Sequence, residues 1–440
     1  MQVNHTYNLD RKISYFFTSY KAKFIAKKVG ATLRKPRKFS CIDIIISFWK
    51  LQSIGEFSYD KWAEQIGILR NTTISGQALW KRIRPEIIDL LKVLVNKSFK
   101  QKFGTFIDGK VFKHFENVLI QDATHFKMPK SMAVYFPGSY SRYGKSSTAK
   151  VQATFNLKKG IYSDFTLSSF RNNDQKESPE ILKQIRKKDL IIRDLGYFVL
   201  KVFSLIDKKG AYYLSRLKYG ISIFDEETSE KISLIKLLKK CNGPIDMIVK
   251  LGEKEKLKCR LVAIPVPEKV ANQRKRKAKL ERNKKSNHSK KYYKLLEYTF
   301  FITNVLDDVW SAEDISDAYR SRWYIETLFK GWKSNLKMKN NVPPKHITKT
   351  RVEFFIYASL LMTNILVLPV FLLVNKTVEC TMKKSISIIK LCSYISNNIA
   401  LIIQNNSMEN LISHAKYSCL YESRKSRKNS LELMQTYPLG

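Results

Sequence analysis

The run FFIYASLLMTNILVLPVFLLV, residues 354–374, carries no charged side chain and therefore has to be covered, by lipid or by protein. Its length would suffice to cross a bilayer. Against a membrane span, the run contains the polar or helix-disfavouring residues Ser359, Thr363, Asn364 and Pro369, and it stands alone in a chain that is 27% charged. We therefore predict a buried core helix. A basic protein anchored in a membrane by this run stays the alternative.

The bulk composition supports a sizeable core and a polyanionic partner. The chain has 440 residues, of which 44% are hydrophobic, enough for two or three domains. Its 80 Lys and Arg outnumber its 38 Asp and Glu, which gives a net charge of +42. Self-repulsion on this scale favours a polyanion as partner. Nucleic acid is the first candidate, because phosphate neutralisation releases counterions, and an anionic membrane surface is the second.

The cysteines and the first residues bear on the compartment. Six cysteines are scattered without a CxxC pair, at Cys41, Cys241, Cys259, Cys380, Cys392 and Cys419. This spacing argues against a zinc ribbon and a disulfide framework, and it fits a reducing compartment. The opening MQVNHTYNLDRKISYFF lacks a continuous apolar stretch, so we expect no signal peptide and a cytoplasmic protein.

Residues 1–115 are predicted to be helical and basic, and they are a candidate region for binding DNA ends. Ser58 is placed to cap a short helix that Gly67 ends, and Ser75 is placed to cap a second, longer helix. Two helices joined in this way resemble a helix-turn-helix, although the connection is longer than the usual tight turn. A generic helical bundle is an equally good interpretation.

Residues 116–218 alternate β-prone and helical segments, which predicts an α/β layer arrangement. The expected strands are 117–128, 147–157, 160–170, 189–198 and 210–218, with a helical segment at 176–189.

Residues 219–305 are predicted to be a β-rich insertion with strands at 245–251, 258–266 and 297–305. Within it, the dense Lys/Arg run 269–294 is either a solvated loop or an arm that follows a nucleic-acid backbone, with Tyr292 and Tyr293 available for stacking.

The chain then returns to helices. Ser311 and Asp314 resemble a capping box at the start of a helical region. We expect residues 306–375 to complete the core and residues 376–440 to form a helical tail.

The stretch YRSRWYIETLFKGWK, residues 319–333, combines four polar residue types at fixed spacing: Tyr319, Arg322, Glu326 and Lys333. At about 100° per residue their offsets fall within roughly 60° of one another on a helix. One helix face would then carry a phenol, a guanidinium, a carboxylate and an ammonium group. This face is either a phosphate-binding surface beside a metal ligand or an ordinary salt-bridged surface with an i, i+4 pair.

Three carboxylates are candidates for metal binding. Asp122 lies in the middle of an apolar strand, and Asp194 ends a later buried strand, where open α/β sheets place their sites. Glu326 belongs to the helical stretch above. A carboxylate in an apolar strand is costly unless it is paired or binds a cation, and Mg²⁺ prefers oxygen ligands. Two such ions about 4 Å apart can stabilise the attacking and leaving oxygens of a phosphodiester displacement.

With these residues in place, the chain resembles the DDE transposases of bacterial insertion sequences, in the insertion-sequence-four family. The resemblance rests on the Tyr-Arg-Glu-Lys signature in YRSRWYIETLFKGWK, on Asp122 in QDATHF and on Asp194 in RDLGYF. YYLSRLK and FFITNV also look like family segments that flank the insertion. It covers residues 116–370 well and the N-terminal helices loosely.

The resemblance implies an RNase H-like catalytic core interrupted by the β-rich insertion. It implies that Asp122, Asp194 and Glu326 hold two Mg²⁺ or Mn²⁺ ions, and that Tyr319, Arg322 and Lys333 bind DNA phosphates. The activity would be metal-dependent cleavage at element ends and strand transfer into target DNA. The partners would be DNA and a second copy of the chain in a homodimer, in the cytoplasm at the nucleoid. A catalytically inactive DNA-binding relative and a simple RNase H-like nuclease are the alternatives.

Overall fold

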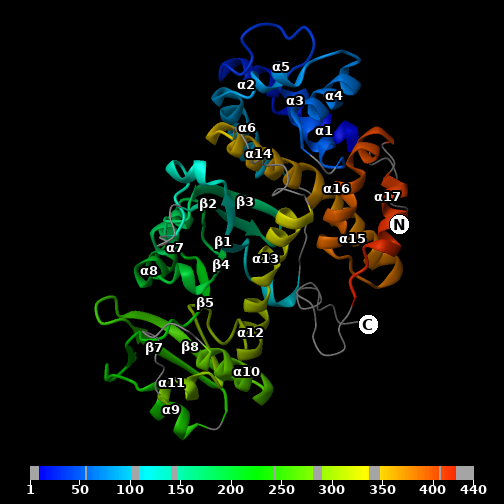
Figure 1. The fold of residues 1–440 in the computed structure, drawn as a ribbon. Helices are drawn as coiled ribbons and strands as arrows, with labels where there is room; N and C mark the ends of the chain where they lie inside the picture. Colours follow the sequence, from blue (N-terminus) through cyan, green and yellow to red (C-terminus); the bar gives the residue numbers. More distant parts are fainter. Residues whose placement is uncertain are drawn as a thin grey trace. The chain divides into compact units, whose positions relative to one another are not determined.

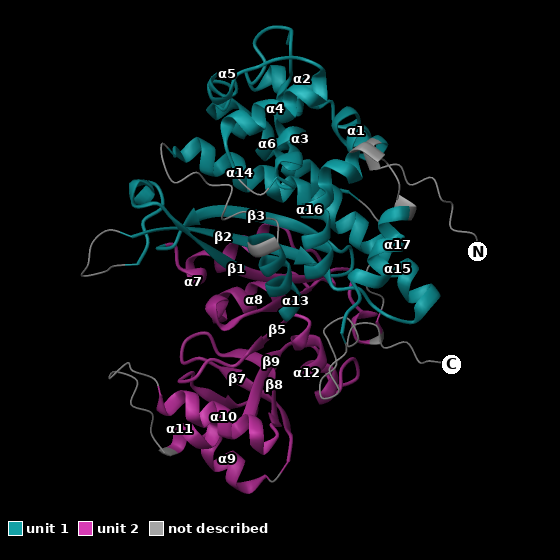
Figure 2. Ribbon diagram, turned by 45° about the vertical axis from the view of Figure 1, so that its right-hand side comes forward, with its two compact units in different colours: residues 1–106, 123–171, 323–432 teal, residues 107–122, 172–322, 433–440 magenta. Residues whose placement is uncertain are grey.

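The computed structural model describes residues 9–54, 57–101, 109–139, 146–241, 243–280, 290–335, 347–405 and 408–422. The chain forms two compact units, which Figure 2 distinguishes by colour. Unit 1 comprises residues 1–106, 123–171 and 323–432, and unit 2 comprises residues 107–122, 172–322 and 433–440. Within the described residues the chain passes between the units at three places: inside one strand after Asp122, after Arg171, and between two helices after Arg322. Whether the five predicted segments are domains of their own stays a prediction.

Unit 1 begins with helices: α1 Leu9–Ser19, α2 Ala22–Lys28, α3 Cys41–Leu51, α4 Tyr59–Arg70, α5 Gly76–Trp80 and α6 Pro85–Ser98. The two predicted caps are confirmed, because the Ser58 and Ser75 hydroxyls accept backbone N–H bonds at the starts of α4 and α5. Two predicted boundaries are wrong. Helix α4 continues through Gly67 and ends at Asn71, which takes the left-handed conformation with φ 47°. Helix α5 is short, and α6 starts separately at a proline, which suits a first helical turn.

The uncharged run lies in a long helix of unit 1, made of α14 Lys349–Met362, a π-helical turn Thr363–Val367 and α15 Leu368–Met382. Its length and composition would allow a membrane span, yet 83% of its most apolar window is buried inside the protein. Helix α14 packs against α6 (Figure 1). The run's Asn364 donates to Ser98 Oγ at 2.9 Å, and its Ala358 carbonyl accepts from the Trp49 indole at 2.9 Å. The burial agrees with the predicted core helix. Helices α16 Ile388–Asn405 and α17 Met408–Ser418 follow.

A nine-stranded sheet runs through the chain in the order β3-β2-β1-β4-β5-β9-β8-β7-β6. β1 pairs with β4 and β4 with β5 in parallel, whereas β2–β3 and all pairs from β5 to β6 are antiparallel. The strands are β1 Val118–Met128, β2 Ser147–Asn156, β3 Ile161–Ser169, β4 Leu190–Arg193, β5 Tyr212–Arg216, β6 Ile223–Asp225, β7 Ile245–Leu251, β8 Leu257–Pro265 and β9 Tyr298–Thr303. The coarse prediction of an α/β fold is therefore confirmed. The strands of the predicted insertion extend the sheet through the β5–β9 pair.

Unit 2 contains the helices α7 Asp174–Glu177, α8 Leu200–Lys208, α9 Leu234–Lys240, α10 Glu268–Lys279, α11 Lys290–Leu295 and α12 Ala312–Arg320. The predicted helical segment 176–189 is helical only in its first part, where α7 is followed directly by a 3₁₀ helix, Ser178–Lys183. Helix α8 was not predicted, although Phe203 and Ile206 at its core face pack with Ile191 and Tyr213 of the sheet.

The described residues of the basic run 269–294 are helical except Leu280, in α10 and α11, so its interpretation as a loop is wrong there. Ala271 is buried, whereas most cationic side chains of α10 are exposed. Contact between this run and nucleic acid stays a prediction.

Candidate active site

The predicted capping box opens helix α12. The Ser311 hydroxyl accepts from the Asp314 backbone N–H at 3.2 Å, and the Asp314 carboxylate accepts from the Ser311 N–H at 2.9 Å. This reciprocal pair fixes the start of the helix that leads to the signature residues.

Helix α12 ends at Arg320, and a new helix, α13 Trp323–Lys330, begins three residues later. Between them the Ser321 hydroxyl donates to the Ala318 carbonyl at 2.6 Å, and the Arg322 N–H donates to Tyr319, three residues back. This local bonding replaces the i to i−4 ladder of an α-helix. A π-helical turn, Gly331–Asn335, follows α13. The prediction that residues 319–333 form one helix with a single polar face is therefore wrong.

Asp122 and Asp194 converge on the side chain of Arg322 within unit 2. Arg322 Nη1 lies 3.1 Å from Asp122 Oδ2, and Arg322 Nε lies 3.8 Å from Asp194 Oδ1. The Arg322 side chain is 5% exposed, against 16% for Asp122 and 35% for Asp194. The β1–β4 register explains why the two acids meet: Gln121 pairs with Arg193, Asp122 follows Gln121 within β1, and Asp194 follows Arg193 directly after the end of β4. Two carboxylates thus share one guanidinium group.

Arg193 forms a second, fully buried link between the same two strands. Its guanidinium donates to Gln121 Oε1 at 2.6 and 3.1 Å and to the Ser178 carbonyl at 2.7 Å. It lies over the ring of Tyr197, and burial lowers the pKa of Arg193 to about 9. This link fastens β1 to the end of β4, directly beside Asp122 and Asp194. Sequence reasoning missed it, although an arginine closing the apolar run DLIIRD was a signal.

Tyr319 lies between two arginines of unit 2. Its hydroxyl accepts from Arg216 Nε at 3.2 Å. The guanidinium carbons of Arg216 and Arg322 lie 5.6 and 5.8 Å from the ring centroid. Burial raises the pKa of the phenol. In this structure the predicted phosphate ligands Tyr319 and Arg322 both contact protein groups.

Glu326 and Lys333 belong to unit 1. Glu326 lies in the first turn of α13 and is partly exposed. Lys333 lies in the π-helical turn, with its ammonium nitrogen 5.2 Å from the ring centroid of Phe126 on β1. Phe126 also packs edge-on against Trp332 at 5.6 Å. Both contacts lie within unit 1.

A divalent metal would find hard oxygen ligands here. Among the described residues, no group of three or more His, Cys, Asp or Glu side chains is gathered to hold a metal ion. Asp122 and Asp194 do converge, and Arg322 already sets a cation between their oxygens. Such a carboxylate pair matches the ligands that Mg²⁺ and Mn²⁺ take.

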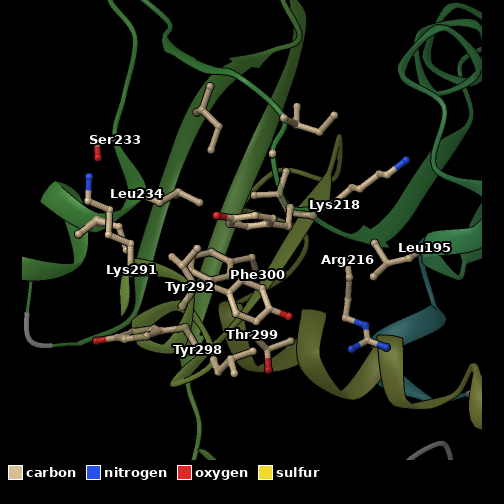
Figure 3. A pocket seen from close by; sticks show the side chains of 18 of the residues that line it. Leu195, Arg216, Lys218, Ser233, Leu234, Lys291, Tyr292, Tyr298, Thr299 and Phe300 are labelled. Carbon is tan, nitrogen blue, oxygen red and sulfur yellow. The ribbon is translucent and has the colours of Figure 1, made fainter. Parts of the chain in front are cut away.

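A cavity of about 1130 Å³ lies in unit 2 between the sheet and helices α9, α10 and α11. Figure 3 shows Arg216 and Leu195 on one side of it and Lys291 on the other. Its lining holds six Lys or Arg residues and no acidic residue. The rings of Tyr219 and Tyr292 meet edge-on at 5.1 Å at this cavity. Its chemistry suits an anionic, aromatic-stacking ligand.

A second cavity, of about 710 Å³, lies in unit 1 beside the loop that joins α2 to α3. Arg70 at its wall pairs with Asp43 at 2.6 Å, and Lys38 donates to the Thr73 carbonyl at 3.0 Å, which anchors the loop. Five further cations of its wall are exposed and make no ion pair with the described residues: Lys23, Lys27, Arg34, Lys35 and Arg37. The last four stand at the end of α2 and in the loop that follows it. We call these four residues the α2–α3 basic cluster.

Comparison with known proteins defines the class. Residues 113–365, more than half of the chain, match the family model described as the transposase DDE domain, and the chain belongs to this family. The transposase for insertion sequence element IS231D of Bacillus thuringiensis subsp. finitimus is 30% identical over 77% of this chain and 74% of its own length. That for IS231B of subsp. berliner is 28% identical, over 86% and 83%. That for IS1151 of Clostridium perfringens is 25% identical, over 80% of each.

A solved structure of piggyBac transposase in a synaptic complex with hairpin DNA aligns with 96% of this chain and 87% of its own. The identity is 10% and the TM-score 0.45, so we base no argument on this likeness.

Proposed function

We propose that this chain is the transposase of a bacterial insertion sequence, which cleaves DNA at the element's ends and joins those ends to target DNA. One observation carries the proposal. In a chain of the transposase DDE domain family, two aspartates from neighbouring parallel strands converge on one cation. We also propose membership of the insertion-sequence-four family, because Tyr319, Arg322, Glu326 and Lys333 keep its signature spacing.

An RNase H-like core is part of this proposal. The strand order β3-β2-β1-β4-β5, with β1, β4 and β5 parallel and β2–β3 antiparallel, supports it. Residues 219–305 would interrupt this core as a β-rich insertion before the helix that carries Glu326.

Asp122, Asp194 and Glu326 are the residues that would hold two Mg²⁺ or Mn²⁺ ions. Ions bound there would activate first a water and then a 3′-hydroxyl for attack on a phosphodiester. The chain's own groups would bind and orient the DNA. Arg322 can engage a phosphate through two parallel N–H bonds, and Lys333 supplies a point charge. The Tyr319 hydroxyl, now bonded to Arg216, would give a further phosphate contact.

DNA binding would draw on the whole basic chain. The net charge of +42, the α2–α3 basic cluster and the basic cavity beside α10 and α11 each support contact with phosphates. We place the binding of element ends in residues 1–115. We further propose a homodimer across paired ends, in the cytoplasm at the nucleoid.

The test uses purified protein, a duplex bearing the DNA that flanks its gene, and Mg²⁺ or EDTA. We expect Mg²⁺-dependent cutting at the flanks followed by joined products. Glu326→Gln should abolish both and leave DNA binding nearly intact, because only a metal ligand is lost. Cutting by the variant would contradict the role of Glu326. Binding without cutting by the wild type would favour an inactive relative, and cutting without joining would favour a simple nuclease.

A further inference from the structure

Arg322 stands where its charge opposes metal binding. Its guanidinium contacts Asp122 Oδ2 at 3.1 Å and Asp194 Oδ1 at 3.8 Å, and these are oxygens that a divalent ion would need. Because the side chain is only 5% exposed, water screens its charge weakly. An ion placed between the same carboxylates would meet a guanidinium group at close range, and the two cations would repel each other.

We propose that Arg322 keeps the aspartate pair closed to metal in the DNA-free chain, and that a DNA phosphate takes over Arg322 as the divalent ions enter. This inference rests on the proposed function. It gives one residue two successive partners, first the carboxylates and then a phosphate. Both partners suit a guanidinium, which pairs with either anion through the same fork of N–H donors.

The local backbone allows this exchange of partners. Arg322 lies in the short break between α12 and α13, where the i to i−4 ladder is interrupted at Ser321. A residue between two helices can be redirected without unwinding either of them. By contrast Arg193, which also links β1 and β4, is fixed by buried hydrogen bonds to Gln121 and Ser178. One arginine therefore holds the strands together while the other can change partner.

The exchange has a functional consequence. Metal would be retained only where a phosphate already lies against Arg322, so that cleavage chemistry would assemble on bound DNA and not on the free protein. A salt bridge with a purely structural role would instead persist in the metal-loaded state, and its removal would weaken or leave unchanged the binding of metal.

The experiment measures Mn²⁺ affinity in solution by calorimetric titration, without cleavage as a readout. The proteins are the wild type, Arg322→Gln and Arg322→Lys, each with and without a duplex bearing the gene's flanks. The Asp122→Asn/Asp194→Asn double variant is titrated alongside and subtracted, which removes ions held by DNA or by other sites. Thermal unfolding of each variant controls for folding.

Without DNA, we expect Arg322→Gln to bind Mn²⁺ about tenfold or more tightly than the wild type, because a close positive charge is gone. Arg322→Lys keeps the charge and should stay near the wild type. Adding the duplex should tighten binding by the wild type by about the same factor and change Arg322→Gln little.

Equal Mn²⁺ affinity of the wild type and Arg322→Gln without DNA would overturn the exchange while leaving a working metal site. If Arg322→Gln does not fold, the titration of the wild type is the test. A wild-type Mn²⁺ affinity that the duplex leaves unchanged would overturn the exchange. Absence of Mn²⁺ binding at the aspartates in every protein, with and without DNA, would instead overturn the proposed function.

Discussion

At the scale of single residues, two buried arginines serve the same pair of strands in different ways. Arg193 has neutral acceptors, the Gln121 amide and the Ser178 carbonyl, whereas Arg322 has two carboxylates. A buried charge without an opposite charge is retained only where hydrogen bonds compensate for its lost hydration. The contacts of Arg193 are therefore expected to stabilise the fold, and those of Arg322 to depend on what else binds the aspartates.

Replacing Arg193 tests the structural role. Arg193→Ala should destabilise the chain by about 3 kcal/mol, because it leaves buried acceptors without donors and opens a cavity. Arg186→Ala is the matched control, since Arg186 is exposed and its side chain makes no hydrogen bond or ion pair with the described residues. Urea denaturation and hydrogen exchange of the β4 amides measure both. A loss no larger than that of the control would contradict a stabilising role for Arg193.

Part of the candidate site could be predicted from the sequence alone. Asp122 and Asp194 were predictable because each is a carboxylate in or at the end of an apolar strand, and the parallel β1–β4 pair brings them together. The pairing of Arg322 with Asp122 joins residues 200 positions apart, and it depends on where a helix ends and on strand register. Neither is visible in a spacing pattern.

At the scale of elements, apolar and β-prone runs predicted the long strands correctly, whereas the prediction of one helix over residues 319–333 was wrong. The spacing of Tyr319, Arg322, Glu326 and Lys333 assumed an unbroken 100° advance per residue. The Ser321 hydroxyl donates to the Ala318 carbonyl, a helix carbonyl that a backbone N–H would otherwise use. The later π-helical turn changes the angle between successive residues a second time. Short elements such as β6 and α9 were missed because three to seven residues contain too little periodicity.

The cap of α12 gives a prediction about this element. Ser311→Ala should weaken the first turn by about 1 kcal/mol, because the Asp314 N–H loses its acceptor, and amide exchange in α12 should accelerate by about fivefold. Ser311→Thr keeps the hydroxyl and serves as the control. Hydrogen exchange followed by mass spectrometry over residues 311–322 reports both. Equal exchange in the two variants would show that the box does not stabilise α12.

At the scale of the whole molecule, positive charge is spread widely, and a general attraction to DNA would follow from +42 alone. A surface that binds DNA specifically has to contact phosphates directly, beyond its contribution to the net charge. The α2–α3 basic cluster is the best candidate in unit 1, because its loop is anchored by the Lys38–Thr73 bond while Lys27, Arg34, Lys35 and Arg37 remain exposed.

Replacing the four residues of the cluster with Gln should lower the salt dependence of DNA binding. If each contacts one phosphate, the slope of log affinity against log salt should fall by about three to four. The control replaces Lys187, Lys188, Lys208 and Lys209 with Gln, which removes the same charge. These lysines precede the parallel strands β4 and β5, at the end of those strands away from Asp194. Fluorescence anisotropy with a flank duplex at several salt concentrations measures both variants. A smaller slope in the cluster variant alone would assign phosphate contacts to the α2–α3 basic cluster. Equally reduced slopes in both variants would mean that DNA binding depends only on the total charge.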